Sequence, residues 1–108
     1  MGLDRLELVR DSKALNSRLF SLPKLLILDS LEEYGLDGAA YREIKAGLEL
    51  EDGILYTSLS ALKKMHYISV KKIRLENQTM TSYSLTSDGK QALDDVKRWL
   101  KQWLEVRR

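Results

Sequence analysis

The sequence lacks residues on which several classes of protein depend. None of its 108 residues is cysteine, and His66 is the only histidine. Disulfides, thiolate metal sites and cysteine nucleophiles are therefore excluded, and a single histidine has no cysteine or second histidine with which to hold a metal ion. The absence of cysteine fits a reducing compartment, so we expect a cytoplasmic protein with no bound metal or cofactor.

Long apolar runs are also missing. No stretch approaches the ~18 uncharged apolar residues of a membrane-spanning helix. Asp4, Arg5 and Glu7 interrupt the pattern that a signal peptide would need. We therefore expect no membrane partner.

Features of an enzyme active site are scarce as well. Gly35, Gly38 and Gly47 are scattered at expected helix ends and turns, and they are not gathered into a phosphate-binding loop. Most carboxylates fall on the polar faces of expected helices, where a solvated charge is their ordinary role. We find no candidate catalytic residues and predict that the protein is not an enzyme.

What the chain does contain is enough apolar content for a core and an uneven distribution of charge. Apolar residues make up 44% of its 108 residues, which predicts one domain over residues 1–108. The net charge is only +2, but residues 29–52 contain eight acids against Arg42 and Lys45, whereas residues 53–74 contain five bases and no acid. A basic surface of this kind suits a phosphate backbone, although a solvated helix end beside a solvated hairpin gives the same pattern.

Hydrophobic periodicity predicts a series of helices interrupted by one hairpin. The expected helices cover residues 3–20, 23–34, 41–48, 52–65 and 87–105, with Pro23 in the first turn of the second and Thr86 capping the last. Two strands at 68–75 and 81–85 flank a turn at 76–79. A change of apolar phase between Lys71 and Lys72 predicts a bulge or a strong twist.

The helix at 52–65 has two contrasting faces. Leu55, Leu59 and Leu62 share one face at helical spacing, and the opposite face shows small, hydroxyl and basic residues. With the short helix before it, it forms a helix-turn-helix, whose second helix is the one that enters the DNA major groove. We interpret it as a recognition helix and the basic hairpin as a wing.

Two tryptophans on the last helix indicate self-association. They are spaced i,i+4 beside a stripe of leucine and valine, which is more apolar surface than a small domain usually exposes. We predict a homodimer through Leu3, Leu6, Val9, Val96, Trp99, Leu100, Trp103 and Leu104. The alternative is that both tryptophans pack on their own domain. A small-molecule effector would have to bind in this interface.

Three segments resemble a known family. Residues 53–62 (GILYTSLSAL) are similar to the G-x-L-Y-x-x-L-x-x-L recognition-helix pattern of PadR-like transcriptional regulators. Residues 83–93 (YSLTSDGKQAL) resemble their Y-x-L-T-x-x-G-x-x-A-L junction, and residues 41–44 (YREI) fit the aromatic-x-E-aliphatic start of their second helix. More loosely, the chain is similar to winged-helix regulators of the MarR and ArsR types.

The resemblance covers residues 23–93 and implies a fold and a function. The fold is a mainly α (α+β) winged helix-turn-helix, with an extra N-terminal helix (1–20), a winged-helix core (23–85) and a long C-terminal dimerisation helix (86–108). The implied function is sequence-specific binding of double-stranded DNA by a homodimer that regulates transcription.

The expected DNA contacts follow from this arrangement. The side chains that would enter the major groove are Ile54, Tyr56, Thr57, Ser60, Ala61 and Lys64. The basic side chains of Arg42 and Lys63 would bind backbone phosphates. The wing would lie on the backbone or in the minor groove through Lys71, Lys72, Arg74, Asn77, Gln78 and Thr79.

The chain departs from the family pattern at three positions. His66 stands where the family usually ends the recognition helix with glycine, and we expect it to end the helix in the left-handed conformation. Glu51 replaces the usual serine or threonine cap and places an acid, next to Asp52, near the phosphates. Ile54 stands where many relatives carry a polar base reader, and it could contact a thymine methyl group.

A winged helix that binds another protein is the second interpretation. Glu51, Asp52 and the low net charge favour it, because acids at the start of the recognition helix oppose DNA binding. Salt dependence separates the two interpretations: DNA binding should weaken steeply with salt, whereas an interaction module should show little DNA affinity at any salt.

Overall fold

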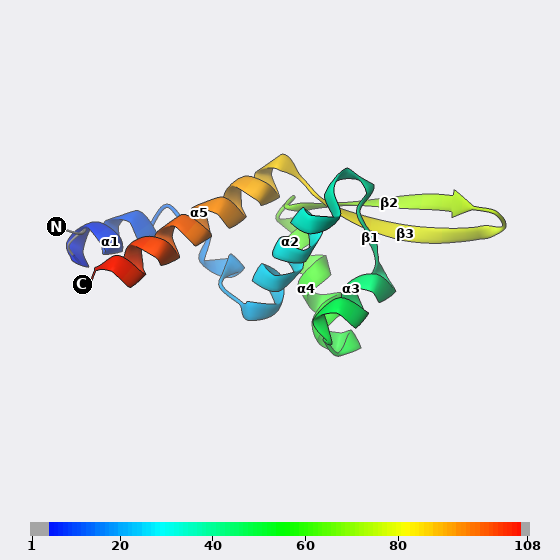
Figure 1. Cartoon of the computed structure of the whole chain (residues 1–108), viewed down its shortest axis with the longest axis horizontal. Helices are drawn as coiled ribbons and strands as arrows, with labels where there is room; N and C mark the ends of the chain where they lie inside the picture. Colours follow the sequence, from blue (N-terminus) through cyan, green and yellow to red (C-terminus); the bar gives the residue numbers. More distant parts are fainter. Residues whose placement is uncertain (1–4, 107–108) are drawn as a thin grey trace.

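The computed structural model describes residues 5–106. The molecule measures 59 × 25 × 21 Å along its principal axes, with a pair of helices at one end and a hairpin at the other (Figure 1). Its elements are α1 (Arg5–Ser12), the 3-10 helix η1 (Ser17–Leu19), α2 (Leu22–Tyr34), the 3-10 helix η2 (Gly35–Asp37), β1 (Ala39–Ala40), α3 (Tyr41–Leu48), α4 (Asp52–Lys64), β2 (Ile68–Leu75), β3 (Gln78–Leu85) and α5 (Ser87–Glu105). The predicted mainly helical α+β architecture is confirmed.

Helix α2 lies at the centre of the core, to which it contributes Ile27, Leu28 and Leu31. Ser21 caps its start by accepting a hydrogen bond from the Lys24 N–H at 3.2 Å, and Pro23 fills the first turn, where no N–H donor is needed. Gly35, with φ of +70°, ends the helix. The buried core consists of Leu19, Ile27, Leu28, Leu31, Ala39, Ile44, Leu55, Leu59, Leu62, Ile68, Leu93 and Val96.

The predicted N-terminal helix at 3–20 is wrong in its length. Helix α1 ends at Ser12, whose hydroxyl donates to a carbonyl of the preceding turn at 2.6 Å. Asn16 then caps η1 by accepting from the Arg18 N–H at 3.0 Å, and Leu19 is fully buried in the core. The chain turns here because one straight helix could not both lie along α5 and place Leu19 against α2.

The sheet contains a short strand that the sequence did not predict. Strand β1 pairs with β3, so the antiparallel order is β1-β3-β2, with Ala39 opposite Tyr83. Gly38 precedes it with φ of +72°, and a Cβ atom there would overlap the Tyr83 carbonyl oxygen. Glycine at this position therefore allows the close approach of the two strands.

The bulge predicted between Lys71 and Lys72 is absent. Strands β2 and β3 pair residue by residue along their full length, with Glu76 and Asn77 as the turn between them. The apolar phase changes for a different reason: Ile73 lies beyond the end of the core and is exposed. The prediction of a bulge is wrong because alternation in a sequence reports burial as well as register, and the alternative of a strong twist stays a prediction.

Thr86 joins the end of α4 to the start of α5. Its N–H and hydroxyl donate to the carbonyl oxygens of Tyr67 and His66, at 3.1 and 2.8 Å. The same hydroxyl accepts from the Gly89 N–H at 3.0 Å, which confirms the predicted cap. A Cβ atom at Gly89 would overlap the Tyr67 carbonyl oxygen, so this junction needs both the threonine and the glycine.

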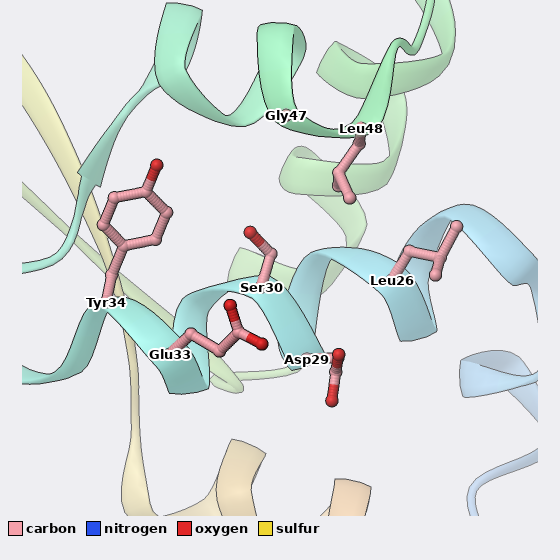
Figure 2. A pocket seen from close by; sticks show the side chains of 7 residues that line it. All are labelled: Leu26, Asp29, Ser30, Glu33, Tyr34, Gly47 and Leu48. Atoms are coloured by element: carbon pink, nitrogen blue, oxygen red, sulfur yellow. The ribbon is translucent and has the colours of Figure 1, made fainter.

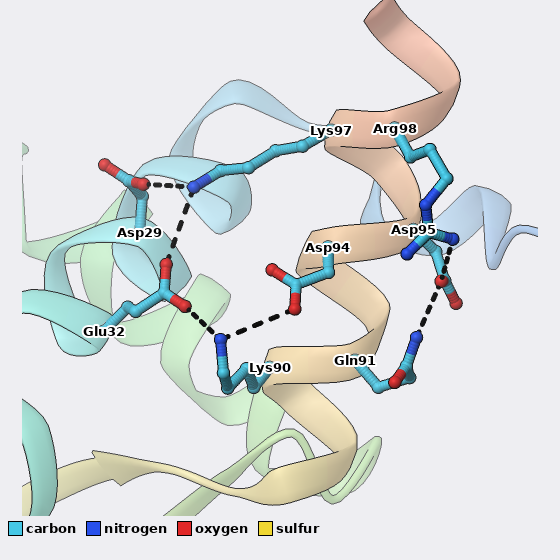
Figure 3. Close-up of polar contacts among 8 residues, drawn as sticks. All are labelled: Asp29, Glu32, Lys90, Gln91, Asp94, Asp95, Lys97 and Arg98. Atoms are coloured by element: carbon cyan, nitrogen blue, oxygen red, sulfur yellow. Dashed lines mark hydrogen bonds and ion pairs between the residues drawn. The ribbon is translucent and has the colours of Figure 1, made fainter.

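Ion pairs hold α5 against α2 (Figure 3). Lys97 Nζ lies 2.8 Å from an Asp29 oxygen and 3.6 Å from Glu32, and Lys90 Nζ lies 2.9 Å from Glu32. The hydrogen bond from Lys90 lowers the pKa of Glu32, and the hydrogen bond to Asp29 raises the pKa of Lys97. We call these four residues the α2–α5 seam.

At the far end of the molecule, α1 packs beside the last turns of α5 (Figure 1). The Trp99 indole N–H donates to the Leu8 carbonyl oxygen at 2.9 Å, and the Phe20 and Trp103 rings pack against Trp99 with centroids 6.0 and 5.6 Å away. Trp99 thus packs largely within its own chain. Exposed apolar side chains remain around it, namely Leu6, Val9, Phe20, Trp103 and Leu104.

The predicted dimer interface includes one buried residue and one residue outside the described part of the chain. Val96 is only 1% exposed because it belongs to the core beneath α5, so its assignment to a surface was wrong. Leu3 lies outside the described residues.

Within residues 5–106, no helix is long and apolar enough to cross a membrane.

Candidate nucleic-acid interface

Helices α3 and α4 form the helix-turn-helix. Helix α3 spans the predicted residues and is stabilised at its start by Glu43, whose carboxylate accepts from the Ala40 N–H at 2.9 Å. Glu49 ends it in the left-handed conformation, with φ of 52°. This tight turn lets α4 begin three residues later, and its bounds differ by one residue from the predicted 52–65.

The two faces of α4 are separated as its periodicity predicts. Leu55, Ser58, Leu59 and Leu62 are buried against the core. Of the predicted groove and phosphate residues on this helix, Ser60 and Ala61 are half-buried and the rest are exposed: Ile54, Tyr56, Thr57, Lys63 and Lys64. The structure therefore brings the predicted residues of this helix to one side of α4.

The two acids at the start of α4, Asp52 and Glu51, differ in their contacts. Asp52 accepts a hydrogen bond from the Tyr41 hydroxyl at 3.0 Å and forms an ion pair with Lys45 at 2.9 Å. The hydrogen bond from Lys45 lowers the pKa of Asp52, so a charged carboxylate is partly neutralised by a base on α3. Glu51 is exposed and caps the helix without a side-chain hydrogen bond.

Sequence reasoning missed this group around Asp52. Tyr41 and Lys45 are one helical turn apart on α3, so their common face could have been read from the sequence. Their contact with Asp52 depends on the angle between α3 and α4, and no local sequence pattern predicts that angle. Desolvation, followed by the hydrogen bond to Asp52, raises the pKa of Tyr41.

His66 ends α4 in the left-handed conformation, as predicted, with φ of 64°. The His66 N–H donates to the Lys63 carbonyl at 3.0 Å, and the Tyr67 N–H donates to the Leu62 carbonyl at 3.0 Å. This pair of bonds is the Schellman arrangement that usually carries glycine. His66 therefore has a structural role in the turn from α4 into β2.

The β2–β3 hairpin, which we call the wing, extends its bases away from the core. Lys71, Lys72 and Arg74 are all exposed. Because side chains alternate along a strand, Lys72 and Arg74 lie on one face and Lys71 lies on the other. The tip residues Asn77, Gln78 and Thr79 are exposed too, although the last two belong to β3 rather than to the turn.

The basic side chains near α4 and on the wing form no ion pairs with the residues that the structure describes. Within residues 5–106, ion pairs engage Lys45, Lys90, Lys97 and Arg98. The bases predicted to contact DNA form no ion pair with any described residue: Arg42, Lys63, Lys64, Lys71, Lys72 and Arg74. We call the exposed face of α4 together with the wing the α4–wing surface, and its charges are free to meet a polyanion.

A hollow between α2 and α3 is acidic, in contrast to the basic α4–wing surface (Figure 2). It has a volume of about 460 Å³ and contains Asp29 and Glu33 but no base. Carboxylates repel phosphate, so this hollow does not suit a nucleic-acid backbone. No cluster of three or more histidine, aspartate or glutamate side chains within residues 5–106 is placed to hold a metal ion.

Comparisons with known proteins agree with this geometry. A family model described as a winged helix DNA-binding domain matches residues 24–104. No curated protein matches the chain in sequence. Among solved structures, the YusO protein of Bacillus subtilis is similar with a TM-score of 0.71 at 17% identity, covering 94% of this chain and 67% of that one.

Two further structures are similar. A PadR-like transcription factor of Bacteroides fragilis has a TM-score of 0.66 at 19% identity and covers 93% of this chain and 91% of its own. A mutant of MepR from S. aureus, solved bound to an oligodeoxyribonucleotide, has a TM-score of 0.68 at 13% identity and covers 96% and 75%. The predicted winged-helix resemblance is confirmed, and the chain belongs to the winged helix DNA-binding domain family.

Proposed function

We propose that the protein is a sequence-specific DNA-binding transcriptional regulator that acts as a homodimer. The observation that carries this proposal is the α4–wing surface of a winged-helix fold, where hydroxyl, small and basic side chains lie together and the bases have no carboxylate partner among the described residues. The similar PadR-like structure is named as a transcription factor, and the similar MepR structure contains DNA.

In this proposal α4 enters the major groove. Tyr56, Thr57 and Ser60 offer hydroxyl groups to base edges, and Ile54 and Ala61 offer apolar contacts to thymine methyl groups. Lys64 lies on the same face. Arg42 on α3 and Lys63 on the flank of α4 bind phosphates on either side.

The wing supplies contacts beside the recognition helix. Lys72 and Arg74 lie on one face of the hairpin and Lys71 on the other, so a hairpin laid along the backbone meets phosphates from both faces. The exposed polar groups of Asn77, Gln78 and Thr79 at the tip suit the backbone or the minor groove.

Selection of bound duplexes from a random pool tests this function directly. We expect enrichment of a sequence made of two inverted half-sites, because a twofold dimer reads a palindrome. Affinity for the selected site should fall steeply with salt. A pool that yields no enriched sequence, with weak binding at every salt concentration, would overturn the proposal.

A homodimer is supported by the exposed apolar side chains at the α1–α5 end. Trp103 is 52% exposed and Leu104 is 77% exposed, and Leu6, Val9 and part of Leu100 lie on the same helical pair. We expect a species of twice the 12.5 kDa chain mass in sedimentation at micromolar concentration. The double variant Trp103→Glu/Leu104→Glu should sediment as a monomer and retain its helical circular dichroism; a wild-type monomer would contradict the dimer.

A protein-interaction module is the second candidate, and Glu51 is the observation that favours it. This acid is exposed at the start of α4 and has no ion-pair partner among the described residues. Glu51→Gln separates the candidates, because it should strengthen binding to the selected DNA if α4 approaches phosphates. Unchanged DNA affinity would favour the interaction module.

A further inference from the structure

A second hollow, which is basic, lies at the C-terminal end of α4. It has a volume of about 500 Å³ and is lined by Asn16, Arg18, Lys24, Ala61, Lys64 and Met65. Its three bases come from η1, α2 and α4, and no acid lines it. The fold therefore brings together three positive charges that are far apart in the sequence.

These three bases have no carboxylate partner within residues 5–106. None of Arg18, Lys24 and Lys64 forms an ion pair with a described residue. Lys24 Nζ donates to the Arg18 carbonyl oxygen at 2.8 Å, which uses one of its three N–H donors and leaves two. Like charges gathered around one hollow repel each other, and an anion between them would relieve that repulsion.

Asn16 holds this arrangement in place. Its amide nitrogen donates to the Tyr67 hydroxyl at 3.2 Å and contacts the Met65 sulfur at 3.6 Å. Its amide oxygen accepts from the Arg18 N–H at 3.0 Å. One half-buried side chain thus fixes the η1 turn against the end of α4.

The hollow continues the α4–wing surface. Ala61 and Lys64 line the hollow and also belong to the α4 face predicted to enter the major groove. A DNA strand that borders the groove at the end of α4 would therefore pass the hollow. A phosphate there would meet all three bases.

We infer that Arg18, Lys24 and Lys64 form a phosphate-binding site for the DNA backbone at the end of the recognition helix, with Asn16 as a positioning residue. The inference rests on the proposed DNA-binding function and extends the contact surface to the N-terminal segment. Phosphate contacts carry no base information, so this site fixes the position of α4 in the groove and adds affinity for any sequence.

The test compares Arg18→Gln/Lys24→Gln with a charge-matched control. The control Arg98→Gln/Lys101→Gln removes the same two charges from exposed positions on α5. Affinity is measured from low to moderate salt, on the selected site and on an unrelated duplex. Thermal unfolding of each variant confirms that the fold is retained.

We expect Arg18→Gln/Lys24→Gln to weaken binding to both duplexes by the same factor. The slope of log affinity against log salt should become less steep by about 0.9 for each phosphate that is no longer neutralised, which is about 1.8 for two half-sites. Ethylation interference should disappear at one phosphate position in each half-site. The control should keep the wild-type slope and interference pattern.

Asn16→Ala tests positioning, because it keeps every charge. It should lose the interference signal at that phosphate, while variants that only remove distant charge should not. If the wild-type protein binds DNA with steep salt dependence but Arg18→Gln/Lys24→Gln keeps the slope and the interference pattern, this inference alone is overturned. If the wild-type protein binds no DNA at any salt, the proposed function falls with it.

Discussion

Two lysines of the wing and two lysines of α5 are the same residue type in opposite surroundings. Lys71 and Lys72 are exposed and have no carboxylate partner among the residues that the structure describes, whereas Lys90 and Lys97 are paired with Glu32 and with Asp29 on α2 (Figure 3). The placement of acids, more than that of bases, decides which positive charges a partner can reach. A net charge of +2 conceals this division.

The largest expected effect comes from reversing charge on the α4–wing surface. Lys64→Glu/Lys72→Glu removes two phosphate contacts per subunit and adds repulsion, so we expect affinity for the selected site to fall by roughly 100-fold or more at physiological salt. Fluorescence anisotropy with labelled duplex measures the change in affinity. Unchanged affinity would show that this surface does not meet DNA.

The next effect is on folding, through the junction that joins α4 to α5. Gly89→Ala places a Cβ atom against the Tyr67 carbonyl oxygen, so the start of α5 must shift. We expect a loss of about 1–3 kcal/mol in the free energy of unfolding, measured by urea denaturation. Gly53→Ala is the control, because a Cβ atom there meets no neighbour within 4 Å.

A smaller effect is expected from the α2–α5 seam. Lys97→Gln removes the pairs with Asp29 and Glu32, but all three side chains are partly exposed, so we expect a cost below about 1 kcal/mol in the free energy of unfolding. DNA affinity should stay within about twofold of wild type, because the seam lies apart from the α4–wing surface. A larger loss of affinity than Lys64→Glu/Lys72→Glu causes would reverse the comparison between the two regions.

The smallest effect is on pH dependence. The pKa of Glu32 is lower in the folded protein than its ordinary value of about 4.5, so its carboxylate stabilises the fold above that pH. This contribution disappears as the pH falls through the folded-state pKa. Glu32→Gln should therefore lose less stability than wild type between neutral pH and about pH 3, measured by urea denaturation at each pH. Equal losses would show that folding does not lower the pKa of Glu32.

Most element boundaries could be predicted because their signals are local. Pro23, Gly35 and Thr86 mark helix ends by backbone chemistry, and the bounds of α3 and α5 match the prediction residue for residue. His66 could also be placed, because its left-handed conformation follows from its position at the helix end.

The remaining features depend on contacts between distant segments. The break after Ser12 and the burial of Val96 arise from how α1 and α5 meet the core, which periodicity alone does not specify. Arg18 and Lys24 were missed as binding residues for the same reason. The bonds of Asn16 place Arg18 beside the end of α4, and the packing of α2 against α4 brings Lys24 there as well.

Thr86 has a mechanical consequence for the proposed dimer. Its hydrogen bonds attach the end of α4 to α5, a helix of 19 residues and about 28 Å. If α5 pairs with its twofold mate near its far end, the crossing angle there sets the distance between the two recognition helices. Because α5 is long, a rotation of a few degrees at Trp103 would produce a larger change in the distance between the two recognition helices. The crossing angle would therefore select the number of base pairs between half-sites.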